Sequence, residues 1–351
     1  MRIIMHYTKP SYYDNFRCTA GDCPDTCCQG WQIIIEPEAI ERYKANPELW
    51  DYVKDSIDYQ SAEDGPCYKL EGNHCTHLTE DGLCEMQVKY GFDALCQICK
   101  LFPRHTEEYD GERELSIDLS CPVGAEMILN DTEGRFESWD DDTEETDDYE
   151  DFDYFLYTEL QEARENLFKL IDHKGDIDTL LSVILTMAKN WQECLDDNRV
   201  CEMNEERYLS LMECFNYENE KRLFSKLFDM ELLRHEWIDT VQTTFDKVFA
   251  DEASYKKAVT RLEDYNPYIR RVLRYMIYVY FNGAVYDDMI FAKAAFAVFC
   301  TRWSFFVFFA LDDSGDEMTD LINAVYIFSR EVEHSDININ MLEDWFEETL
   351  L

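Results

Sequence analysis

The uneven distribution of cysteine is the feature that most constrains how this chain folds. Ten of its fourteen cysteines lie between Cys18 and Cys121, and the sequence "CTAGDCPDTCCQGW" at 18–31 contains four of them. The later cysteines are Cys194, Cys201, Cys214 and Cys300. These four fall in helical, partly apolar segments, where a free thiol packs as a small hydrophobic group. The chain therefore has two chemically different halves.

An acidic segment separates the two halves. Residues 131–153 carry thirteen acidic residues against Arg135, a composition too charged to collapse into a core. We therefore predict a cysteine-rich metal- or cluster-binding domain at 1–130, a solvated acidic linker at 131–153 and a helical domain at 154–351.

Hydrophobic periodicity predicts the fold class. Residues 31–37 and 113–122 are short β-branched or alternating segments that end at proline, which is typical of strands. Residues 154–171, 179–195 and 268–286 place apolar residues three and four apart with almost no glycine or proline, which is typical of packed helices. The predicted fold is mainly α: an irregular cysteine-rich N-terminal domain with a few short β-strands, followed by an all-α helical domain.

Charge and hydropathy limit the partners. The net charge of −43 repels phosphate backbones, so we expect no nucleic-acid partner, whereas basic proteins would be attracted. Residues 291–311 are long enough to span a bilayer, but Lys293 and Arg302 favour a buried helix. The first residues lack the apolar stretch of a secretory signal, so we expect a cytoplasmic protein. The apolar helices leave self-association or peripheral membrane contact open.

Three interpretations of the cysteine-rich half compete. A disulfide framework is disfavoured in a reducing cytoplasm. A redox pair at Cys96 and Cys99, with Lys100 and Arg104 nearby to favour the thiolate, would leave eight cysteines unexplained. Metal coordination accounts for more of them, because soft thiolates select zinc or iron-sulfur clusters and both accept four cysteines. His74 and His77 flank Cys75, but we leave both out of the predicted ligand set.

Several motifs resemble the flagellin lysine N-methylase family. They are the cysteine cluster that ends in "CCQGW", "LCQICKLFPR" at 95–104, "LSIDLSCPVGAEMIL" at 115–129 and "REVEHSDINI" near the C-terminus. The first half alone also resembles a broader cysteine-rich domain that chelates zinc or iron. By this resemblance the metal ligands are Cys23, Cys27, Cys28, Cys75, Cys84 and Cys99, together with the methylase family's additional positions Cys18, Cys96 and Cys121. Cys67 matches a further cysteine of that family.

The resemblance implies a protein-lysine N-methyltransferase that transfers a methyl group from S-adenosylmethionine to flagellin lysines and holds a 4Fe-4S cluster. Two sequence patterns that other S-adenosylmethionine enzymes use are missing from this chain. No G-x-G occurs among the twelve glycines, so a Rossmann-type cofactor turn is missing. The spacing C-x-x-x-C-x-x-C of a radical enzyme is also absent. The alternative is a non-enzymatic zinc- or iron-binding protein whose helical domain docks a partner.

Candidate residues for the chemistry are few. Glu331, Glu333 and His334 form a polar cluster that the family shares, although a helix end with a surface histidine and a following loop explains the same pattern. Arg104 has the planar fork that suits a cofactor carboxylate, and a structural salt bridge explains it equally well. The general base, the S-adenosylmethionine site and the modified lysines are not determined by the sequence.

Overall fold

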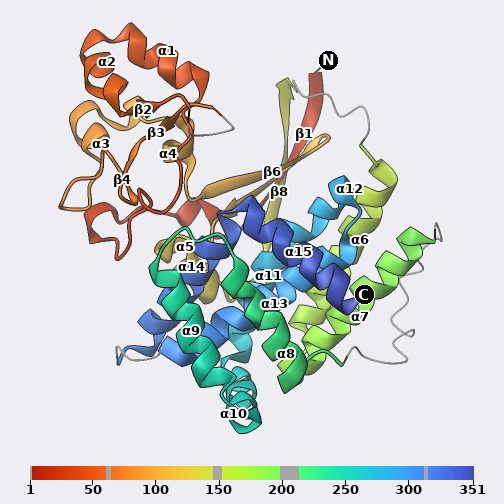
Figure 1. The fold of residues 1–351 in the computed structure, drawn as a ribbon. Coiled ribbons are helices and arrows are strands. Elements are labelled where there is room, and N and C mark those ends of the chain that lie inside the picture. Colours follow the sequence, from red (N-terminus) through yellow and green to blue (C-terminus); the bar gives the residue numbers. More distant parts are fainter. Residues whose placement is uncertain (1, 61–64, 145–151, 198–212, 312–314) are drawn as a thin grey trace.

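The computed structural model describes residues 2–60, 65–144, 152–197, 213–311 and 315–351 (Figure 1). The strands are β1 (Arg2–Pro10), β2 (Ile57–Asp58), β3 (Cys67–Tyr68), β4 (Leu70–Glu71), β5 (His74–Cys75), β6 (Arg104–Tyr109), β7 (Glu112–Ile117) and β8 (Phe136–Glu144). The helices before the acidic segment are α1 (Pro37–Ala45), α2 (Pro47–Val53), α3 (Glu85–Tyr90), α4 (Gln97–Leu101) and α5 (Pro122–Asn130).

Most of the described residues after 152 lie in α-helices. They are α6 (Tyr154–Asp172), α7 (Ile177–Asp196), α8 (Tyr217–Phe224), α9 (Glu236–Val248), α10 (Glu252–Leu262), α11 (Asn266–Tyr280), α12 (Ala284–Asp287), α13 (Ile290–Leu311), α14 (Glu317–Glu333) and α15 (Asp336–Leu350). The predicted fold class, mainly α with an irregular cysteine-rich part and a few short strands, is confirmed.

A four-stranded sheet in the order β6-β7-β1-β8 connects the two halves. β6 and β7 form an antiparallel hairpin, whereas β1 pairs parallel with β7 and antiparallel with β8. The strand predicted at 113–122 is confirmed as far as Ile117, and Pro122 begins α5. The strand predicted at 31–37 is wrong: Ile34 makes only an isolated bridge with Cys67.

The acidic segment is not the linker that its composition predicts. Residues 136–144 form the edge strand β8 along the whole length of β1. Trp139 stacks on Tyr7 with ring centroids 5.0 Å apart, and His6 Nδ1 lies 2.8 Å from Asp140 Oδ1. Backbone pairing needs no apolar core, so exposed acidic side chains are compatible with an edge strand. Residues 145–151 of the predicted linker lie outside the described residues.

Helix α13 forms the centre of the helical half, where α7, α9, α11, α14 and α15 pack on it (Figure 1). It is long and apolar enough to cross a membrane, but 89% of its apolar window is buried, which confirms the predicted buried helix. Its two cations are paired: Lys293 Nζ lies 2.7 Å from Glu343 Oε2, and Arg302 Nε lies 2.7 Å from Glu220 Oε1. The helix therefore offers no large exposed apolar face for membrane contact.

The two largest apolar cores lie in different parts of the chain. The smaller one lies in the cysteine-rich part, with Ile33, Ile35, Tyr43 and Tyr68 among its buried residues. The larger one fills the helical half and also includes Leu119 and the inner face of α5. Figure 1 shows the cysteine-rich part to one side of the sheet and the helical half below it, with α4, β6 and the α14–α15 junction between them.

Candidate functional site

The structure gathers six of the predicted ligand cysteines from three parts of the chain. They are Cys27 and Cys28 in the first loop, Cys75 and Cys84 around the β5 turn, and Cys96 and Cys99 at the start of α4. The Cys75 N–H donates to the Cys28 carbonyl at 2.8 Å, which fixes the first loop against β5. A hydrogen bond with Cys96, burial and the charges of Cys28 and Cys75 raise the pKa of Cys99, so thiols from all three parts lie near one another.

Two pairs of neighbouring thiols share hydrogen bonds in this cluster. The Cys28 thiol lowers the pKa of Cys27 to about 7 through a hydrogen bond, with help from the nearby Arg330 charge. The Cys99 thiol lowers the pKa of Cys96 in the same way. A thiolate is the form of cysteine that binds metal.

Three further predicted ligands border a cavity beside this cluster. Cys18, Cys23 and Cys121 line a cavity of about 480 Å³ that also touches Cys27, Cys28 and Cys84. Cys67 lies apart in β3, where Asp58 is its paired neighbour. Both ring nitrogens of His77 have hydroxyl partners: Nε2 lies 2.9 Å from Ser56 Oγ, and Nδ1 lies 3.1 Å from Tyr52 Oη.

The clustered cysteines have the chemistry of ligands for zinc or an iron-sulfur cluster, although their side chains are not arranged around a common centre. Within the described ranges, no three Cys, His, Asp or Glu side chains are close enough to hold a single metal ion as they stand. The thiols instead pair through hydrogen bonds, as at Cys27 with Cys28 and Cys96 with Cys99. Thiolate sulfur is the ligand type that zinc and iron-sulfur clusters share, so the chemistry of the cluster does not separate the two.

An ionic clamp fastens the first cysteine loop to the helical half. Asp25 accepts from both terminal nitrogens of Arg234, at 2.6 and 3.1 Å, and lies 2.8 Å from Arg330 Nη1. Arg330 also donates to the Thr26 carbonyl at 3.1 Å. Gly30 has a φ of +92°, and a Cβ there would lie 3.4 Å from Arg234 Nε, so glycine suits this close approach. Sequence reasoning missed this clamp because its members are far apart along the chain.

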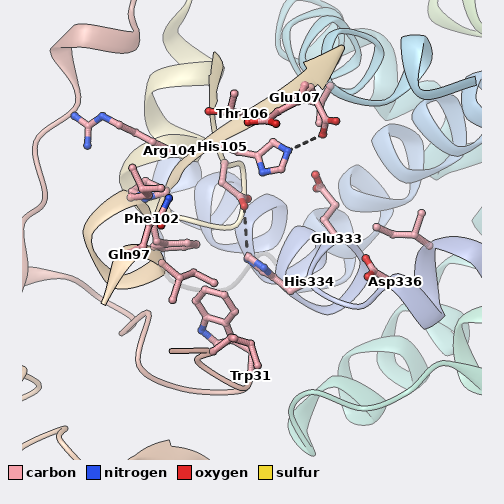
Figure 2. Close-up of a pocket in the computed structure, with 18 of the residues that line it drawn as sticks. Trp31, Gln97, Phe102, Arg104, His105, Thr106, Glu107, Glu333, His334 and Asp336 are labelled. Atoms are coloured by element: carbon pink, nitrogen blue, oxygen red, sulfur yellow. Dashed lines mark hydrogen bonds and ion pairs between the residues drawn. The ribbon is translucent and has the colours of Figure 1, made fainter. Parts of the chain in front are cut away.

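A second cavity, which we call the acidic cleft, lies between the cysteine-rich part and the helices (Figure 2). It has a volume of about 760 Å³, and β6, α4, α11 and the α14–α15 junction contribute its walls. Six carboxylate residues line it: Glu36, Glu107, Glu108, Asp118, Glu333 and Asp336. A cavity with this lining attracts a cation, because the carboxylates concentrate negative potential in a partly desolvated space.

Glu333, at the end of α14, is the most strongly perturbed carboxyl group of the acidic cleft. Burial raises its pKa to about 8, and the negative charge of Asp118 contributes. Tyr280 and Tyr275 of α11 both donate to Glu333 Oε2, at 2.8 and 3.3 Å. A carboxyl group poised near neutral pH in a cavity is suited to exchange protons with a bound substrate. Sequence reasoning named Glu333, but nothing distinguished these two tyrosines among twenty-two.

His334 is not the surface residue that the simple explanation of "REVEHSDINI" assumes. It caps α14, and burial lowers its pKa. Ser120 Oγ lies 2.5 Å from His334 Nε2, and the ring packs 5.0 Å from Trp31 and 5.8 Å from Phe102, measured between centroids. No loop follows, because α15 begins at Asp336. The helix end was expected correctly, but Glu331 is buried there, and Glu333 and His334 are half-buried where they line the acidic cleft.

Glu331 and Arg104 have separate roles. Glu331 is buried, burial raises its pKa to about 7, and its Oε2 accepts from the Leu233 and Arg234 backbone N–H groups. The Arg104 guanidinium lies over the rings of Tyr13 and Phe16, at 5.7 and 5.1 Å from their centroids. Figure 2 shows Arg104 directed away from Glu333 and His334. Arg104 therefore stacks on aromatic rings of the N-terminal part.

The later part of the chain decides the family. Residues 142–351, which supply Tyr275, Tyr280, Glu333 and His334, match the model of the FliB lysine N-methylase C-terminal domain. The chain belongs to this family. The family predicted from the motifs is thereby confirmed, and the predicted enzyme class, a protein-lysine N-methyltransferase, agrees with it.

Curated relatives agree with this assignment. The chain is 31% identical over 131 residues to the flagellar biosynthetic protein FliU of Salmonella muenchen, a match that covers 35% of this chain and 77% of the relative. It is equally identical, over the same length, to the lysine-N-methylases of Salmonella choleraesuis and Salmonella typhimurium, but those matches cover only 32% of each relative. The match thus spans about a third of the length of these two lysine-N-methylases. No solved structure matches the chain.

Proposed function

We propose that this protein methylates lysine side chains of flagellin in the cytoplasm, with S-adenosylmethionine as the methyl donor, and that the acidic cleft receives the lysine. One observation carries the proposal: Glu333, with a pKa of about 8, lies in an acidic cavity formed by the helices of a lysine N-methylase family. The printed names of the relatives, which refer to flagellar biosynthesis and lysine methylation, support flagellin as the substrate.

The acidic cleft provides what an attacking amine needs. A lysine ammonium entering it replaces water with the carboxylates of Glu333, Asp118 and Glu107, which offset the cost of its desolvation. The amine attacks only after losing a proton, and Glu333 is placed to accept it. Tyr275 and Tyr280 then donate to the carboxyl group and keep it oriented.

The methyl donor supplies an electrophilic methyl group on a sulfonium when it is bound. Trp31, Phe102 and His334 form an aromatic wall of the acidic cleft, and the ring faces of Trp31 and Phe102 can attract such a cation. The ring of Trp31 is held by its own indole N–H, which donates to the Cys27 carbonyl at 2.7 Å. The cysteine loop therefore positions a wall of the cleft.

The cysteine cluster would hold a 4Fe-4S cluster, with zinc as the alternative. We take its ligands from Cys27, Cys28, Cys75, Cys84, Cys96 and Cys99, which lie near one another, while Cys18, Cys23 and Cys121 border the same region. Such a group would tie three segments of the chain together, as bound metal does in small cysteine-rich domains. Through Trp31 it would also stabilise the wall of the acidic cleft.

Methyl transfer tests the proposal directly. The anaerobically purified protein, incubated with labelled S-adenosylmethionine and the flagellin of its own organism, should give labelled methyllysine. Glu333→Gln should reduce kcat by about 100-fold, the size of a typical general-base contribution. Glu348→Gln, which changes an exposed carboxylate on α15, is the matched control and should keep full activity. Wild-type protein with its full metal content that labels no lysine would refute the proposal.

A further inference from the structure

Strand β6 is an edge of the sheet that borders the acidic cleft. The sheet order β6-β7-β1-β8 gives β6 one neighbour, β7, and no strand of the described residues pairs with its other side. Such an edge carries peptide groups that can pair with another extended chain.

The register shows which peptide groups of β6 face outward. The Asp118 N–H donates to the Pro103 carbonyl at 2.7 Å, so this opposed pair is a hydrogen-bonded one. Hydrogen-bonded and non-hydrogen-bonded pairs alternate in an antiparallel ladder. The peptide groups of Arg104 and Thr106 therefore point away from β7. One outward group already has a partner: the Tyr286 hydroxyl donates to the Glu108 carbonyl at 2.6 Å, at the end of the strand.

The acidic cleft runs along this outer edge. Alternate side chains of a strand point to opposite faces, so a cavity against one face would be lined by every second residue. The cleft is instead lined by all five consecutive residues 104–108. Figure 2 shows His105 and Glu107 of β6 near Glu333, with the strand itself forming the upper wall. A chain lying along the edge would therefore pass beside Glu333.

We propose that an extended, lysine-bearing segment of the protein substrate binds as an added strand on β6, with its lysine reaching Glu333. This inference rests on the proposed function and names how the substrate docks. Charge supports this occupant, because Glu107, Glu108, Asp118, Glu333 and Asp336 all border the edge or the cleft below it. Backbone pairing would hold the segment with little dependence on its sequence, and the carboxylates would select lysine.

A proline substitution on the outer edge tests the docking. Thr106→Pro removes an N–H that points away from β7, so the β6–β7 ladder keeps its hydrogen bonds, as proline at sheet edges does elsewhere. Thr106→Val is the matched control, because it keeps the N–H and the β-branched shape. The probes are short peptides that each carry one flagellin lysine. Their Kd, measured by fluorescence anisotropy, and their KM should rise about 5-fold or more in Thr106→Pro but not in Thr106→Val. This is the effect of losing one or two hydrogen bonds. The kcat should change little.

A second measurement covers the case in which Thr106→Pro fails to fold. Peptides methylated on successive backbone nitrogens should lose affinity for the unaltered protein at alternate positions, because only every second N–H of an added strand points toward β6. Equal loss at all positions, or unchanged binding in a folded Thr106→Pro protein, overturns the docking while methylation of flagellin still supports the proposed function. Absence of methylation by unaltered, metal-loaded protein overturns the proposed function and this inference with it.

Discussion

Arg330 Nη1 lies 2.8 Å from Asp25 Oδ2, and this ion pair fastens the first cysteine loop to helix α14. Asp25 stands between Cys23 and Cys27, whereas Arg330 lies three residues before Glu333. The clamp therefore ties the loop of the proposed metal ligands to the helix that carries the proposed base. A substitution that breaks the clamp should therefore affect both the cysteine loop and the position of Glu333.

Removing the carboxylate charge of the clamp should destabilise the protein. Asp25→Asn leaves the largely buried guanidinium groups of Arg234 and Arg330 without a counter-charge, and breaking such a pair typically costs about 3–5 kcal/mol. The free energy of unfolding from urea titration measures this. Asp22→Asn, an exposed acid in the same loop, should stay within about 0.5 kcal/mol of the original protein. Equal stability of the two variants would show that the clamp is dispensable.

Glu333 should make methyl transfer depend on pH near neutrality. Its folded pKa of about 8 lies above the ordinary value of 4.5 because of burial, so the carboxylate that accepts the proton becomes populated as pH rises through 8. We expect kcat to rise over that interval and then level off. Tyr280→Phe removes a donor to the carboxylate and should move the midpoint to higher pH. An unmoved midpoint in Tyr280→Phe would assign the titration to another group.

The same carboxyl group should leave a signature in stability. A folded pKa above the unfolded one means that the stabilising contribution is complete below pH 4.5 and is lost as pH rises toward about 8. The free energy of unfolding of the original protein should therefore fall relative to that of Glu333→Gln across this interval. Denaturant titrations of both proteins at several pH values measure the difference, and a constant difference would contradict the raised pKa.

Loss of a clustered cysteine should release the proposed metal group. Cys27→Ser or Cys99→Ser should lower the iron and acid-labile sulfide of anaerobically purified protein and weaken its visible absorption. Cys194→Ser, in helix α7, should retain both, because Cys194 is buried in the helical half. Stoichiometric zinc without sulfide would replace the iron-sulfur proposal with the zinc alternative, and unchanged spectra in both cluster variants would refute the ligand assignment.

The buried cation of α13 should matter for stability and not for the chemistry. Arg302 is fully buried between Glu220 and Asp178, so Arg302→Met leaves the buried Glu220 carboxylate without a counter-charge, although the Tyr255 hydroxyl still donates to it. We expect a loss of about 3–5 kcal/mol in the free energy of unfolding. Lys256→Met, which removes an exposed pair with Glu252, should cost less than about 1 kcal/mol. Similar losses in the two variants would contradict the buried ion pair.

Local patterns in the sequence were sufficient for much of the fold. The helices predicted at 154–171 and 179–195 match α6 and α7 within a few residues, since apolar periodicity reports directly which face is buried. The strand expected at 31–37 is absent, although Ile33 and Ile35 are buried as a strand would bury them. Its apolar residues pack in the cysteine-rich core, and its backbone pairs with residues 66–68 only through the single bridge at Ile34.

Pairing between distant strands was not predictable in the same way. Residues 136–144 have a composition typical of a solvated segment, and their side chains up to Asp142 are mostly exposed. They form β8 because β1 offers backbone hydrogen bonds along its whole length, a partner that no local window contains.

The sequence by itself determined the chemical inventory: a set of clustered thiols, an acidic chain, packed helices and motifs that identify the family. Only the tertiary structure decided which of these groups meet. It brought Cys28, Cys75 and Cys99 together and placed Glu333 against Tyr275 and Tyr280. It also joined Asp25 to Arg330. The physical reason is that composition and periodicity report local preferences, whereas burial, charge pairing and pKa shifts depend on neighbours that come from distant parts of the chain.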